Sequence, residues 1–143
     1  MTIKKIFNAD DFGISKGVNA AIVKAHREGI LNSASLMINQ KYADDAVKLA
    51  KEMPNMEIGL HLNLTNEYPA APAKKIPLLV NEQGKLKNGF LNLFLLSLLK
   101  PKQLRQQVET EMRAQILKYL DTGLPLQHLD SHRHVHMIPQ IFK

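Results

Sequence analysis

The sequence predicts an α/β fold built on a parallel sheet, because strand-like and helix-like segments alternate along the chain. Short β-prone runs are each followed by a stretch in which apolar residues recur with helical spacing. Such a sheet is found either in open, doubly wound folds or in closed β/α barrels, and the alternation alone does not choose between them. The chain has 143 residues, 45% of them apolar, which is enough for one globular domain or for part of one.

The first half of the chain contains three predicted strands and two predicted helices. The strands are expected at Lys4–Asn8, Ser33–Ile38 and Met56–Leu64. Ser15 is a suitable N-cap for the first helix, and Gly29 is expected to end it. The second helix is expected over Ala43–Met53, where Pro54 stops it.

The second half begins with a proline-bearing stretch, approximately 66–100, which we expect to be an insertion or a lid. Within it, the apolar run Phe90–Leu99 is about half as long as a membrane span, so a helix that is buried or covered by a partner is expected. A long helix is predicted over Pro101–Leu120, with an inward face that consists of Leu104, Val108, Met112, Ile116 and Leu120. A fourth strand over Leu126–Asp130 leads into a histidine-rich segment.

Charge and cysteine content narrow the classes of function. The chain has no cysteine, so a bound metal would have to be held by His, Asp or Glu. The net charge of +6 is spread along the chain, which favours a solubilising surface and neither a nucleic-acid nor a membrane partner. The N-terminus lacks the apolar stretch of a secretion signal, and a cytoplasmic location is therefore expected.

Three polar clusters fall at or just after the predicted strand ends, the edge at which both kinds of α/β fold place their sites. Asp11, His61 and His132, one from each cluster, form a candidate metal-binding set that leaves positions open for water and substrate. The adjacent Asp10 is expected to face away from that metal, because neighbouring residues point to different sides. Asp10 is then available as the general base that acts on the water activated by the metal.

Plainer explanations exist for two of these clusters. A pair of aspartates often caps a helix or lies in a solvated turn, and a single histidine in an apolar strand is often a hydrogen-bonded core residue. Packing explains the segment 128–136 less easily, since it holds four histidines and an aspartate. If that segment is extended, alternation puts Asp130, His132, His134 and His136 on one face. The candidate substrate contacts are Asn63, His134 and His136.

Taken together, the motifs NADDFG with SKGVNAAI, GLHLNLT and HLDSHRHVHMIPQ resemble those of the YdjC/ChbG carbohydrate deacetylases from Ile6 to the last residue. The resemblance implies a distorted β/α barrel of the polysaccharide-deacetylase type, of which this chain is the N-terminal part. It also implies metal ligands at Asp11, His61 and His132, a catalytic base at Asp10, and N-acetylated sugars or chito-oligosaccharides as substrates. Magnesium is the usual ion in that family, while the imidazole ligands also suit zinc.

The chain departs from the family pattern in two ways. Arg133 stands where many members have a histidine that is not a ligand, and members continue well beyond this point. We therefore expect either a longer protein or a homo-oligomer that covers the sheet edge, and poor catalysis by this stretch alone. The alternative functions are a metal-dependent phosphoesterase and a non-catalytic fragment or sugar-binding module.

Overall fold

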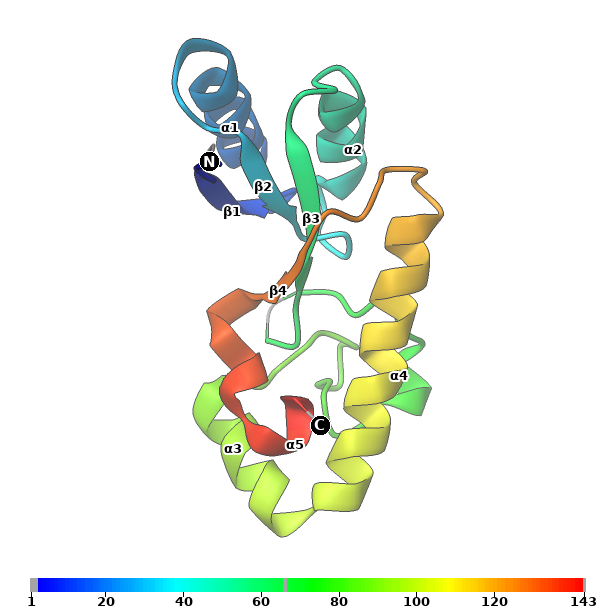
Figure 1. Ribbon diagram of the computed structural model, residues 1–143. Coiled ribbons are helices and arrows are strands. Elements are labelled where there is room, and N and C mark those ends of the chain that lie inside the picture. Colours follow the sequence, from blue (N-terminus) through cyan, green and yellow to red (C-terminus); the bar gives the residue numbers. More distant parts are fainter. Residues whose placement is uncertain (1–2, 66, 143) are drawn as a thin grey trace.

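A four-stranded parallel sheet lies at the centre of the computed structural model, which describes residues 3–65 and 67–142 (Figure 1). The strands are β1 (Asn8–Phe12), β2 (Ser33–Leu36), β3 (Glu57–Leu62) and β4 (Leu129–Ser131). They lie side by side in chain order, and every neighbouring pair is parallel. The parallel α/β fold predicted from the alternation is thus confirmed, and all four strands end at the same edge of the sheet.

The helices are α1 (Lys16–Glu28), α2 (Ala43–Lys51), α3 (Phe90–Leu99), α4 (Pro101–Leu120) and α5 (Pro139–Phe142), with 3-10 turns η1 (Ala73–Lys75) and η2 (His132–Met137). Ser15 caps α1 as predicted, since its hydroxyl oxygen accepts a hydrogen bond from the Val18 backbone N–H. The predicted bounds of the long helix, Pro101 to Leu120, agree with those of α4.

Two apolar clusters form the core of the described residues, and α4 contributes to both. The first lies between the sheet and α1, α2 and the C-terminal part of α4. The second lies among the segment after β3, α3, the N-terminal part of α4, η2 and α5. Met112, near the middle of α4, packs against both clusters. Figure 1 shows α4 running beside the sheet at one end and beside α3 and α5 at the other.

Two strand predictions are displaced along the chain. The first strand was expected at Lys4–Asn8 but begins at Asn8, because pairing with β2 starts there while Ile6 and Phe7 stay exposed. The fourth was expected at Leu126–Asp130 and spans Leu129–Ser131. The first shift moves Asp10 and Asp11 from the expected loop into β1, whereas His132 still follows directly after β4.

The buried face of α4 also differs from the predicted one. Leu104 and Val108 are buried as expected, but Leu120 is 52% exposed. The face turned to the protein instead continues through Glu111, Gln115 and Tyr119, all fully buried. Hydrogen bonds to the backbone of β3 and of the segment that follows it compensate for the burial of these polar side chains.

Helix α3 is only partly covered by the described part of the chain. Leu93 and Ser97 are buried, whereas Leu91, Leu98 and Leu99 are among its mostly exposed residues. The expectation of a helix is confirmed; the described residues do not bury the whole apolar run, and its covering by a partner stays a prediction. Among the described residues, no helix combines the length and the apolar character that crossing a membrane requires.

Candidate metal centre

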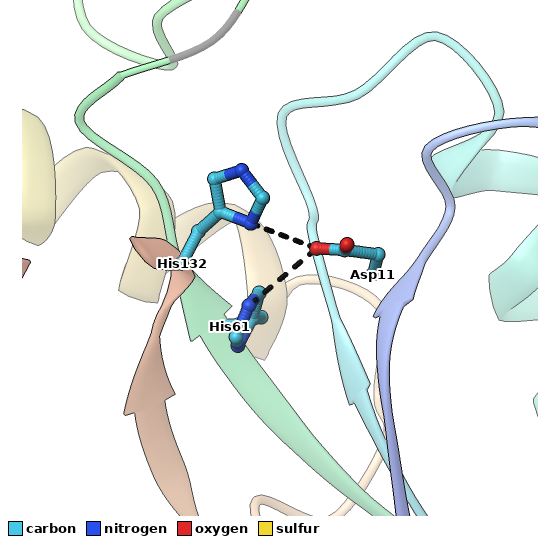
Figure 2. Close-up of side chains that lie close together, drawn as sticks. All are labelled: Asp11, His61 and His132. Atoms are coloured by element: carbon cyan, nitrogen blue, oxygen red, sulfur yellow. Dashed lines mark ion pairs between the residues drawn. The ribbon is translucent and has the colours of Figure 1, made fainter. Parts of the chain in front are cut away.

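Three strand ends bring Asp11, His61 and His132 together (Figure 2). The Nδ1 atom of His132 lies 2.8 Å from Asp11 Oδ1, and the Nε2 atom of His61 lies 3.5 Å from the same oxygen. The two imidazole rings meet edge to face, with centroids 5.5 Å apart. One atom from each side chain therefore points into a common space.

Asp11 owes its direction to an irregular backbone. Its φ is 65°, in the left-handed region, and the pairing register of β1 shifts between Ala9 and Phe12. Gly13 follows with φ 98°, and a Cβ atom there would lie 3.1 Å from the Cα of Ala43, so the loop can turn only with glycine. Aspartate tolerates the left-handed region better than most residues, which makes this bulge compatible with the sequence.

The bulge also changes the position expected for Asp10. Regular alternation would send Asp10 and Asp11 to opposite sides, but both carboxylates approach His61. Asp10 belongs to a second group, with His61 and Asp130, whose potential ligand atoms lie within 4.8 Å of one another. Asp10 is nevertheless absent from the set formed by Asp11, His61 and His132, which agrees with its expected position outside the proposed metal ligands, and its role as a base stays a prediction.

Asp11 Oδ1 lies at the centre of the site, between the two imidazole rings. Asp11 Oδ1 is buried and has no hydrogen bond of good geometry among the described residues, despite its two imidazole neighbours. Neutral imidazoles do not balance the negative charge of this carboxylate, and a cation between the three side chains would do so. Ligand atoms about 2.05 Å from a tetrahedral zinc ion lie about 3.3 Å apart, and those of an octahedral magnesium ion about 3.0 Å apart. The observed 2.8 and 3.5 Å fit a divalent ion after small adjustments.

The other nitrogen of His61 is held by Asp130, a residue outside the predicted site. His61 Nδ1 lies 2.7 Å from Asp130 Oδ1, and the His61 side chain is only 4% exposed. If Nδ1 carries the proton of a neutral imidazole, the Nε2 lone pair faces Asp11, as a metal ligand requires. Asp130 stands two residues before His132 across the end of β4, and this i, i+2 spacing is the sequence signal for it.

The pKa values of this pair follow from the same contact. Burial lowers the pKa of His61, but the hydrogen bond to Asp130 and the nearby carboxylates outweigh burial and raise it above 6.5. Burial raises the pKa of Asp130, but His61 outweighs that effect and holds it below its usual value. In contrast, burial lowers the pKa of His132, although Asp11 acts in the opposite direction. Neutral imidazole, the form that binds metal, is thus favoured at His132.

The segment after His132 is not extended. Arg133 and His134 have φ values of 55° and 53°, and η2 turns the chain away from the sheet. The prediction of one face through His134 and His136 is therefore wrong, because the alternation of a strand ends at Ser131. His134 is exposed, while His136 is half-buried with Nδ1 2.6 Å from Ser131 Oγ.

Asn63, the remaining predicted substrate contact, lies in a buried turn after β3. Its side-chain oxygen accepts a hydrogen bond from the Thr65 backbone N–H at 3.0 Å. Its backbone N–H and carbonyl oxygen both bond to the Gln115 amide. These contacts position the turn, and contact of Asn63, His134 or His136 with a substrate stays a prediction.

This parallel β/α chain is similar to known proteins. A family model described as YdjC-like protein matches residues 4–143, and the chain belongs to that family. It is 43% identical over 139 residues to a carbohydrate deacetylase of Brevibacillus brevis, covering 97% of this chain and 52% of that protein. It is 40% identical to a chitooligosaccharide deacetylase of Proteus mirabilis, with 96% and 51% covered.

A solved structure supports the same placement. A crystal structure of an Enterococcus faecalis protein, whose suggested role is cellobiose-phosphate cleavage, superposes with a TM-score of 0.78 at 30% identity. The match covers 92% of this chain and 49% of that one. The chain spans about half the length of the curated relatives it matches. The resemblance stated from the motifs is confirmed, and the fold is that of part of a family member.

Proposed function

We propose that the protein containing this chain is a metal-dependent hydrolase that removes N-acetyl groups from amino sugars or chito-oligosaccharides. The observation that carries the proposal is the convergence of Asp11 Oδ1, His61 Nε2 and His132 Nδ1, with the Asp10 carboxylate beside them. The names of the two deacetylase relatives support the substrate class.

The proposed metal site consists of Asp11, His61 and His132. A divalent ion bound there would supply positive charge that polarises the acetyl carbonyl group and acidifies a water molecule. The Asp11 oxygen shared by two imidazoles and the Nε2 direction set by Asp130 support one such ion. Both magnesium and zinc remain candidates, since two imidazoles suit zinc and the family resemblance implies magnesium.

Asp10 is the proposed general base. It is exposed, and its Oδ1 accepts a hydrogen bond from Asn8 Nδ2 at 2.9 Å, which leaves Oδ2 to take a proton from the attacking water. Water oxygen then bonds to the acetyl carbon, the C–N bond breaks, and the sugar nitrogen gains a proton as acetate leaves. His134 and His136 are the candidates that this chain offers for the acid that supplies that proton.

The test is an assay of the full-length protein on N-acetyl chito-oligosaccharides, with acetate release as the readout. Acetate should be released, should stop when a chelator removes the metal, and should return when magnesium or zinc is added. His132→Gln should lose this activity. The matched control is His26→Gln on α1, where the histidine Nδ1 contacts the Leu31 backbone oxygen and not the site.

Parallel substrates separate the alternatives. Phosphate release from phosphorylated sugars without acetate release would favour a phosphoesterase, and cleavage of a phosphorylated disaccharide would favour the role suggested for the E. faecalis protein. Binding of chito-oligosaccharides without turnover at any metal concentration would favour a sugar-binding module. Each of these outcomes contradicts deacetylation.

A further inference from the structure

A chain of hydrogen bonds lies beside the candidate metal centre and passes through Ser35. This serine lies in β2 and is completely buried. Its Oγ atom is 2.8 Å from Asp130 Oδ2, 2.9 Å from Asn8 Nδ2 and 3.0 Å from His128 Nε2. One hydroxyl group on the second strand therefore contacts side chains from the first strand and from the region of the fourth.

The chemistry of these partners allows one consistent pattern of donors and acceptors. A hydroxyl group has one hydrogen to donate and two lone pairs to accept with. An ionised Asp130 can only accept, so the Ser35 hydrogen points to it. The Asn8 amide donates to Ser35, and the imidazole of His128 donates its Nε2 hydrogen. The hydroxyl group of Ser35 then uses its one hydrogen and both of its lone pairs in hydrogen bonds.

The chain of hydrogen bonds through Ser35 reaches the candidate metal centre at both ends. On one side, Asp130 Oδ1 lies 2.7 Å from His61 Nδ1, so a fixed carboxylate keeps the proton on Nδ1 and the lone pair on Nε2. On the other side, the second hydrogen of Asn8 Nδ2 goes to Asp10 Oδ1 at 2.9 Å. The proposed ligand His61 and the proposed base Asp10 are thus connected through Ser35.

Gly59 provides independent support, because it makes room for the His128 ring. A Cβ atom at Gly59 would lie 2.3 Å from ring atoms of His128, so any side chain at position 59 would displace the ring. Gly59 is paired with Ser35 in the parallel register of β2 and β3. The missing side chain lets the imidazole lie over the β3 backbone and reach the serine.

We propose that Ser35 is a positioning residue of this site, whose hydroxyl group holds Asp130 and thereby presents His61 Nε2 to the metal, and through Asn8 orients Asp10. The proposal rests on the proposed function only for the roles of the metal and of Asp10. The orientation and tautomer of His61 are properties of the protein alone and can be measured without turnover.

Ser35→Ala tests the proposal in the full-length protein. The substitution leaves Asp130 Oδ2 without its hydroxyl donor and removes the acceptor of Asn8 and His128. Loss of a residue that holds a metal ligand directly typically weakens metal binding by about 10- to 100-fold. Because Ser35 reaches His61 through Asp130, we expect a shift at the lower end of that range, about 10-fold, for zinc measured by calorimetry. In the metal-free protein at pH 9, ¹⁵N spectra of labelled histidine should show the Nδ1–H tautomer of His61 in the wild type and a mixture in the variant.

Ser97→Ala is the matched control. Ser97 is also buried, but it lies on α3 and donates to the Phe94 backbone oxygen, so its loss removes a hydroxyl group without touching the site. Unfolding midpoints of both variants establish that they are folded. If Ser35→Ala does not fold, Ser35→Cys keeps nearly the same shape with a much weaker hydrogen-bond donor and should show the same two effects.

The outcomes separate this proposal from the proposed function. The positioning role would be overturned if Ser35→Ala changed the zinc affinity and the His61 tautomer no more than Ser97→Ala does. A wild type that shows the Nδ1–H tautomer and binds zinc but releases no acetate would instead contradict deacetylation and leave the positioning role in place.

Discussion

Replacing Asp10 and Asp11 separately with asparagine should impair the proposed enzyme in two different ways. Both changes preserve side-chain shape, and neither should unfold the protein. Asp10 is exposed, and an asparagine there can still accept the hydrogen bond from Asn8. Asp11 has a φ of 65°, a conformation that asparagine tolerates as well as aspartate does. Differences in function can therefore be assigned to the lost charge.

Loss of Asp11 should act on metal binding. The substitution removes the one carboxylate from the proposed ligand set, at an oxygen 2.8 Å from His132 Nδ1 and 3.5 Å from His61 Nε2. Changes to outer-shell residues alone cost about 10- to 100-fold in affinity, so loss of the ligand charge should cost more than about 100-fold. Excess metal should then restore part of the activity.

Loss of Asp10 should act on turnover. General-base catalysis contributes about 10²- to 10⁴-fold, so kcat should fall by that factor, which corresponds to about 2.7–5.5 kcal/mol of activation free energy. Because Asp10 is absent from the set formed by Asp11, His61 and His132, metal affinity should change by only a few-fold, and added metal should not restore the rate.

The assay compares the two variants with the wild type in three measurements. These are metal titration by calorimetry, steady-state release of acetate, and thermal unfolding. The reasoning is refuted if Asp10→Asn loses the metal while Asp11→Asn keeps it, since the two roles are then reversed. If neither substitution changes metal affinity, the metal lies elsewhere.

Three further predictions concern the scaffold. Gly59→Ala should lower the free energy of unfolding by about 1–3 kcal/mol, because the new Cβ atom overlaps the His128 ring; an unchanged urea midpoint would contradict the packing described. Tyr119→Phe should cost about 0.5–1.5 kcal/mol in the same measurement, since the Ile58 carbonyl oxygen loses its hydroxyl partner and keeps only the Gln127 backbone N–H; an unchanged midpoint would contradict a stabilising role for this hydrogen bond. Burial raises the pKa of the Glu111 carboxyl group above 4.5, so the folded state binds the carboxyl proton more tightly than the unfolded chain does. This contribution to the free energy of unfolding is present at low pH and is lost as the pH rises through the folded-state pKa. In Glu111→Gln, the free energy of unfolding measured with urea should not show this decline between pH 4 and 7. A wild type that becomes more stable relative to the variant as the pH rises over this range would refute the raised pKa.

The amino-acid sequence by itself determined the features that depend on local spacing. The 3.6-residue periodicity and the proline and glycine signals predicted α1 and α4, including both ends of α4. Alternation of strands and helices predicted a parallel sheet, and the C-terminal ends of parallel strands meet at one edge. For that reason the convergence of Asp11, His61 and His132 could be expected from three motifs that lie far apart in the chain.

Only the tertiary structure decided which way the side chains point once a strand becomes irregular. The left-handed residue at Asp11 brings both aspartates toward His61, and the turn after His132 sends His134 to solvent. The polar contacts of Ser35 depend on the pairing register of neighbouring strands. Sequence periodicity describes a side chain relative to its own element, whereas these contacts depend on backbone from other strands, and so no local pattern predicts them.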